Sequence, residues 1–96
     1  MLSLNYTPQT GTLKGFLLQD AQTFYNSPTN INVRFTLKTF DDQTIHQVIA
    51  RFKGPVANSS YRQFLSRTKA GQKVVIDYEQ APTGRSKYAR KVHICH

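Results

Sequence analysis

The chain has 96 residues, of which 39% are apolar, and a formal net charge of +8 from 13 Lys and Arg against 5 Asp and Glu. This length predicts a single domain over residues 1–96, and no apolar run approaches the roughly 20 residues that span a bilayer. Residues 1–10 lack the basic and apolar regions of a signal peptide. The excess of basic residues favours a polyanionic partner, with nucleic acid ahead of an acidic membrane surface or an acidic protein.

The first half of the chain predicts three strands. Leu13, Gly15 and Leu17 recur at even spacing and place a first strand within residues 11–24, where Gly15 suits a bend. Residues 26–30 have the composition of a loop. Residues 31–38 then alternate apolar and polar side chains, which indicates a strand with one buried face and one solvated face.

A turn at Asp41-Asp42-Gln43 leads into the third strand, Ile45–Lys53, so that the second and third strands form a hairpin. Val48 and Ile49 are adjacent apolar residues in that third strand. They interrupt the alternation and predict either a β-bulge or a strand buried on both faces.

The second half predicts one helix and two strands. Ser59 or Ser60 could cap a helix that runs to about Lys69 and ends at Ala70-Gly71. Its apolar face would hold Tyr61, Phe64 and Leu65. Strands are expected over residues 73–79 and 87–95, joined by a turn at 81–84.

Five strands with one short helix between the third and the fourth describe an all-β fold, the five-stranded OB-fold barrel. The expected arrangement is an N-terminal lead over residues 1–10 and a barrel over residues 11–95. An SH3-like barrel is the main competitor, but it does not need an amphipathic helix at that position.

Four segments carry a resemblance to a known family. The first segment and the second strand match a pattern with a G-x-L-x-x-D core, a tyrosine and a later F-T-L, here at Gly15, Leu17, Asp20, Tyr25, Phe35, Thr36 and Leu37. The third strand, residues 45–52, is similar to W-H-x-V-V-x-F-G, with one extra residue before Phe52. Residues 64–78 and 88–94 are similar to the family's helix end and last two strands.

These segments resemble the bacterial single-stranded DNA-binding protein family, which includes the shorter primosomal replication protein N. The resemblance implies largely sequence-independent binding of single-stranded DNA in replication, recombination or the maintenance of a mobile element. It also implies a homodimer or homotetramer, with replication proteins among the partners. The chain departs from the family in having no Trp, with Ile45 at a family Trp position, and no acidic tail after His96. An RNA-binding OB domain and a protein-interaction module for an acidic partner are the alternatives.

Single-strand binders combine cations that contact phosphates with flat side chains that stack on bases. An OB fold binds across its second and third strands and the flanking loops. The candidate nucleic-acid-binding residues are the basic and aromatic side chains of those elements: Lys14, Phe24, Tyr25, Arg34, Lys38, Phe40, Arg51, Phe52, Lys53, Arg85, Lys87, Tyr88 and Arg90. Phe16, Phe35 and Leu37 are expected in the core, and Arg62, Arg67 and Lys69 on a solvated helix face.

We expect neither an enzyme nor a metal or cofactor site. The five acids, Asp20, Asp41, Asp42, Asp77 and Glu79, form no acid–base pair that the sequence identifies. His93 and Cys95 share one face of the last strand, but a zinc site would need further ligands at loop-like spacing. Cys95 is the single cysteine, which excludes an intrachain disulfide and favours a cytoplasmic location.

Overall fold

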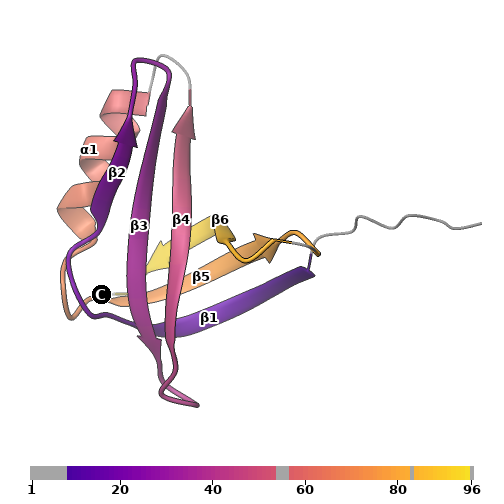
Figure 1. Cartoon of the computed structure of the whole chain (residues 1–96). Coiled ribbons are helices and arrows are strands. Elements are labelled where there is room, and N and C mark those ends of the chain that lie inside the picture. Colours follow the sequence, from indigo (N-terminus) through magenta and orange to yellow (C-terminus); the bar gives the residue numbers. More distant parts are fainter. Residues whose placement is uncertain (1–8, 54–56, 83, 96) are drawn as a thin grey trace, which may run out of the picture.

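The computed structural model of the protein describes residues 9–53, 57–82 and 84–95. Along the chain its elements are β1 (Gln9–Leu17), β2 (Gln22–Asn26), β3 (Asn30–Thr39), β4 (Ile45–Lys53), α1 (Ala57–Arg67), β5 (Lys73–Gln80) and β6 (Lys87–Ile94). Figure 1 shows the long β3–β4 hairpin crossing a second layer made of β1, β5 and β6, with α1 beside β2 and β3.

Strand β3 separates the core from the outer surface of the barrel. Its residues alternate between half-buried and buried along its whole length. The buried set includes Phe35 and Leu37, both with no exposed surface, as the sequence predicts. Strand β4 pairs with β3 without interruption, from Asn30 opposite Lys53 to Lys38 opposite Ile45. The first alternative, a β-bulge at Val48 and Ile49, is therefore absent. The second is met in part, because Val48 is buried in the core and Ile49 lies half-buried on the outer face.

The sheet closes into a barrel through two short contacts. Its strands follow the order β1-β5-β6-β4-β3-β2, and β1 also pairs with β3 over residues 15–17. On the other side, β4 and β6 run parallel and pair only at Val48–Lys87 and Ile49–Tyr88. The five strands β1, β3, β4, β5 and β6 form the predicted OB-fold barrel, and β2 adds an edge strand to it.

A glycine permits the contact that closes the barrel at β1. A Cβ atom added at Gly15 would lie 2.1 Å from the backbone oxygen of Lys38 and 2.7 Å from its carbonyl carbon. No side chain fits at that distance from a backbone atom. The even-spaced Gly15 of the sequence is thus a site of close backbone approach between β1 and β3.

Helix α1 packs its apolar side chains against the inner face of β3. Phe64 meets Phe35 edge to face with ring centroids 4.6 Å apart, and Tyr61 and Leu65 pack on Ile31 and Val33. The helix begins at Ala57, so neither Ser59 nor Ser60 is its N-cap as predicted. After the helix, Gly71 takes a φ of 85° and its backbone N–H donates to the Leu17 carbonyl.

The boundaries of the first two strands differ from the prediction. Strand β1 begins at Gln9, inside the expected lead, and ends at Leu17, while residues 22–26 form the separate strand β2. Between the two strands the chain is bonded to distant residues: the Ala21 N–H donates to the Thr68 carbonyl at 3.0 Å, and Asp20 accepts from the Ala70 N–H at 2.8 Å. These long-range hydrogen bonds have no signature in the local sequence.

We predict that Gly15→Ala destabilises the protein by more than about 2 kcal/mol, because the new methyl group would push the β1 and β3 backbones apart. Urea unfolding followed by circular dichroism measures the loss. Gly84→Ala serves as the control, since a Cβ there would meet Ala81 at 3.3 Å and nothing closer. Equal stability of the two variants would contradict this account of barrel closure.

Candidate nucleic-acid interface

Five side chains form a row across the outer face of the barrel. Arg34 on β3 lies opposite Ile49 on β4, and Ile49 lies opposite Tyr88 on β6. Phe24 from β2 and Arg51 from β4 complete the row by contacting Arg34 and Tyr88 respectively. The row therefore crosses four strands and brings together residues from three separate parts of the sequence. We call it the central row; its members are Phe24, Arg34, Ile49, Arg51 and Tyr88.

Two of its contacts pair a guanidinium group with an aromatic ring. The guanidinium carbon of Arg34 lies 4.7 Å from the ring centroid of Phe24, and that of Arg51 lies 3.9 Å from the ring centroid of Tyr88. Each cation is attracted to the negative face of its ring, a contribution of about 0.5–1 kcal/mol at an exposed site. Both rings lie on the outer face of the barrel, where Phe24 is 43% exposed and Tyr88 is half-buried.

A β-bulge turns Tyr88 to the outside of the barrel. Val92 and Ile94 pack against the core, and simple alternation along β6 would place Tyr88 beside them. Instead, Asp77 on β5 lies opposite Lys91 on β6, but the next residue, Tyr78, lies opposite Ala89. Arg90 is therefore an extra, unpaired residue in β6. Ala89 consequently packs on the core, and Tyr88, a candidate binding residue from the sequence, lies over the outer face.

A similar irregularity in β2 presents two aromatic residues. The register of β2 on β3 shifts between Thr23 and Tyr25, so Phe24 is the unpaired residue there. Tyr25 lies opposite Asn32 and is 50% exposed. Lys53, also exposed, ends β4 opposite Asn30 and extends the basic character of this end of the sheet.

A second group of candidate residues gathers near the tip of the β3–β4 hairpin. Phe16 on β1 lies opposite Lys38 on β3, which lies opposite Ile45 on β4. Phe40 packs against Phe16 with ring centroids 6.0 Å apart and is 47% exposed. The predicted core position of Phe16 is wrong, because β1 points Leu13, Gly15 and Leu17 inward and Phe16 outward. We call Lys14, Phe16, Lys38, Phe40 and Ile45 the hairpin patch.

Acidic residues border the hairpin patch. A pocket of about 400 Å³ lies between Lys14, Phe40, Asp41 and Asp42. Hydrogen bonds from the Thr39 hydroxyl and the Thr44 backbone N–H hold the pKa of Asp42 below its ordinary value. The turn therefore carries negative charge at neutral pH and limits how far an anionic ligand could extend over the hairpin tip.

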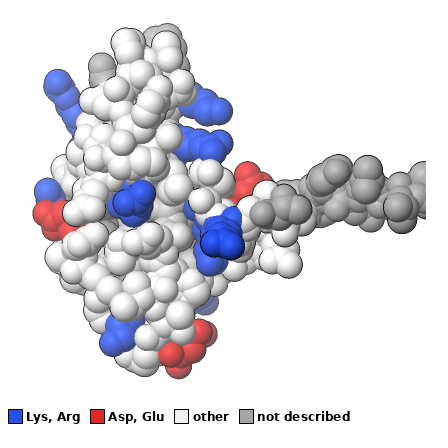
Figure 2. Space-filling model, in the orientation of Figure 1, with Lys and Arg blue, Asp and Glu red and all other residues white. Residues whose placement is uncertain are grey.

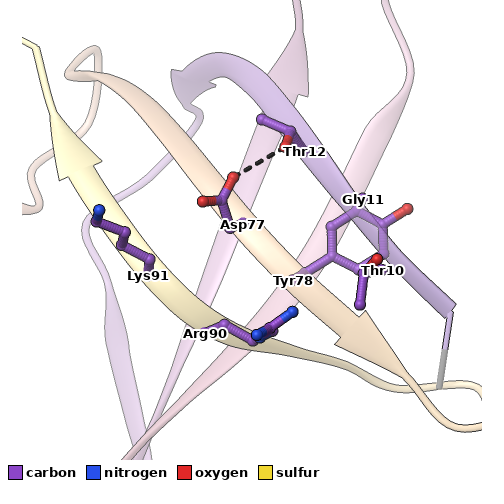
Figure 3. Close-up of a pocket in the computed structure, with 7 residues that line it drawn as sticks. All are labelled: Thr10, Gly11, Thr12, Asp77, Tyr78, Arg90 and Lys91. Atoms are coloured by element: carbon purple, nitrogen blue, oxygen red, sulfur yellow. Dashed lines mark hydrogen bonds between the residues drawn. The ribbon is translucent and has the colours of Figure 1, made fainter. Parts of the chain in front are cut away.

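The remaining candidates lie in the β5–β6 connection or on β6. Arg85 is exposed in the loop, and the Lys87 ammonium lies 5.8 Å from the Tyr78 ring centroid. Figure 3 shows Arg90 at a pocket of about 420 Å³, where the Tyr78 ring lies against Gly11. Asp77 faces the same pocket and accepts a hydrogen bond from the Thr12 hydroxyl at 2.8 Å. This pocket therefore mixes both signs of charge.

Phe52 belongs with the core rather than with the outer face. It is half-buried and meets Phe64 edge to face with ring centroids 5.0 Å apart. The helix residues Arg62 and Arg67 are exposed as predicted, and Lys69 forms an exposed ion pair with Asp20 at 3.8 Å. Phe16, Ile45 and Ile49 are outward residues that the sequence did not identify as candidates, since apolar side chains on a strand predict burial by default.

Charge is unevenly distributed around these groups. In the view of Figure 2, basic side chains are scattered over the face and acidic ones lie toward its edges. Glu79 is the acid nearest in register to the central row, because it lies opposite Tyr88. Among the described residues no group of three or more His, Cys, Asp or Glu side chains could hold a metal ion. None of the described helices is long and apolar enough to cross a membrane.

Comparison with solved structures supports the fold assignment. The mitochondrial single-stranded DNA-binding protein Rim1 of S. cerevisiae superposes on this chain with a TM-score of 0.69, over 92% of this chain and 94% of its own, at 11% sequence identity. No protein-family model matches the sequence, and no curated protein is similar to it. The fold is therefore that of an OB-fold barrel, and the assignment of an activity depends on the residues of the outer face.

We predict that Arg51 and Tyr88 stabilise each other. A double-mutant cycle of Arg51→Ala and Tyr88→Ala should give a coupling free energy of about 0.5–1 kcal/mol, the size of an exposed cation–π contact. Urea unfolding of the four proteins measures it. The matched cycle of Lys53→Ala with Tyr88→Ala should give none, because Lys53 lies two residues further along β4. Equal coupling in both cycles would refute the pairing.

Proposed function

We propose that the protein binds single-stranded nucleic acid, and DNA in particular, across the central row and the hairpin patch. The observation that carries the proposal is the pairing of each aromatic ring in the central row with an arginine: Arg34 with Phe24, and Arg51 with Tyr88. Binding of single strands without sequence preference needs such flat groups for bases beside cations for phosphates.

Each cation–aromatic pair can receive a base in one of two ways. The base can stack on the outer plane of the guanidinium group, or it can replace that group on the ring. In either case the arginine stays within reach of the phosphate next to that base. The mechanism needs no hydrogen bonds to base edges, which agrees with a largely sequence-independent interaction.

The two groups of residues suit one strand of a few nucleotides. Arg34 and Lys38 are outward residues of the same strand, four positions apart, which is about 13 Å at the rise of a β-strand. Thr36, the residue between them on this face, lies opposite Gln47 and supplies a polar surface. A single OB-fold domain binds about 4–16 nucleotides, so one strand can cover both groups.

The proposal includes a role in replication, recombination or the maintenance of a mobile element. It also includes a cytoplasmic location and assembly into a homodimer or homotetramer. In the described chain, residues 9–13 of β1 pair with β5 alone, so their second edge is free to pair with another copy.

The direct test is a titration of labelled oligo-dT, oligo-rU and duplex DNA at two salt concentrations, followed by fluorescence anisotropy. We expect oligo-dT to bind most tightly. Tyr88→Leu, which keeps an apolar side chain but removes the flat ring, should weaken binding by roughly 5- to 150-fold, the value of one stacked base. Arg34→Ala should reduce the salt slope, which is the steepness of the fall of log K with log salt concentration, by about 0.7, the value of one phosphate contact.

Arg62→Ala is the matched control for this titration, because Arg62 is an exposed arginine on the helix, away from the row. Its affinity and salt slope should equal those of the unmodified protein. Failure of every oligonucleotide to bind at low salt would exclude the function. Normal binding by Tyr88→Leu would exclude the central row as its site, and a preference for oligo-rU would favour the RNA-binding alternative.

A second prediction concerns the acid beside the row. Glu79 lies opposite Tyr88 across the β5–β6 pair, so a phosphate bound at Arg51 would approach a like charge. Glu79→Gln should therefore strengthen oligo-dT binding by about two- to fivefold, in line with the free energy of a single surface charge interaction. Asp20→Asn, which removes an equal charge near α1, should leave the affinity unchanged. Weaker binding by Glu79→Gln would contradict the proposed path of the strand.

A further inference from the structure

Two adjoining hollows lie between α1, the end of β4 and β6. They have volumes of about 240 and 210 Å³, and Phe52, Phe64 and Val92 line both. They arise because β4 and β6 pair over two residues only, after which β4 continues to Lys53 without β6 beside it. We call the joined hollows the slot.

The floor of the slot is apolar. Phe64 meets both Phe35 and Phe52 edge to face, at centroid distances of 4.6 and 5.0 Å, and Phe52 in turn meets Tyr61. These contacts fix the positions of the half-buried Phe52 and Phe64 rings. Gln63 is the one uncharged polar side chain among the described residues that line the slot, so apart from its basic residues the slot offers few hydrogen-bonding groups. An apolar side chain matches this floor better than a base does.

The rim of the slot is basic. The charged residues that line it are Arg51, Arg67, Arg90 and Lys91, and no Asp or Glu occurs among its described lining residues. None of the four forms an ion pair with a described carboxylate within 4.0 Å. Their charges are therefore available to an acidic ligand, which would be both attracted and oriented by them.

We propose that the slot is a docking site for a segment of a partner protein that carries one or two apolar side chains flanked by Asp or Glu. The apolar side chains enter between Phe52, Phe64 and Val92, and the carboxylates pair with the four cations. This surface is distinct from the central row but shares Arg51 with it. Docking of the segment would therefore draw Arg51 away from a bound strand and weaken strand binding.

The test uses labelled decapeptides in which a Leu-Phe or Phe-Phe pair stands among Asp and Glu residues, with anisotropy as the readout. Two comparison sets replace the apolar pair by Ser-Ser or the acids by Lys. We expect the acidic apolar peptides alone to bind. Arg67→Glu should weaken them by at least about tenfold, because it replaces an attraction to the peptide carboxylates by a repulsion at the rim of the slot. Arg67→Gln should have a smaller effect of the same sign.

Arg62→Glu is the matched control, because it makes the same charge change on the same helix at an exposed residue that does not line the slot. It should lower peptide affinity by less than about twofold. Arg67→Glu should bind oligo-dT as well as the unmodified protein does, which separates this proposal from the proposed strand-binding function. Circular dichroism confirms that each variant is folded.

Four results would overturn the proposal. If no acidic apolar peptide binds at low salt, the slot has no such ligand. If Arg62→Glu and Arg67→Glu weaken the peptides equally, the attraction is a general effect of net charge. If Arg67→Glu instead loses oligo-dT binding, the slot belongs to the nucleic-acid site. If Arg67→Glu abolishes self-association in sedimentation while peptides do not bind, the occupant is a second copy of the chain.

Discussion

The close approach of β1 to β3 at Gly15 determines how the rest of the barrel is arranged. Because no Cβ stands between the two backbones, β3 can cross β1 and pair with it over residues 15–17, while the other end of β3 pairs with β2. One strand therefore belongs to both layers of the fold. Its outward residues Arg34 and Lys38 connect the central row to the hairpin patch, and its inward residues fill the core.

The sequence contains enough information to predict the barrel but not all of its strand boundaries. Alternation along residues 31–38 identified β3 because that strand is buried on one face over its whole length. The sequence does not predict the break between β1 and β2, although the adjacent residues Leu17 and Leu18 interrupt the alternation there and Leu18 is exposed. Hydrogen bonds to Thr68 and Ala70 hold that break, and no local glycine or proline marks it.

The candidate site was predictable in its composition and less so in its geometry. Arg34, Arg51 and Phe24 were chosen as basic or aromatic residues on the expected strands, and they meet in one row. The orientation of Tyr88 depends on the bulge at Arg90. That bulge is a property of the pairing between β5 and β6, and the alternation of apolar residues along β6 does not reveal it. Phe52 was expected on the binding surface but is half-buried, because it packs against Phe64 of α1. Phe16 was expected in the core but lies on the outer face, where it packs against Phe40.

The strict alternation of β3 also constrains how this chain can change over time. Deleting or inserting one residue there would exchange its two faces, placing Arg34 in the core and Phe35 in solvent. Variation of the outer face in β3 is thus restricted to substitution. The exposed connection between β5 and β6 tolerates changes in length, because its residues Ala81, Pro82 and Arg85–Ser86 support no buried side chain. Relatives with a longer reach toward a ligand would therefore differ in that connection, while the spacing of residues along β3 stayed the same.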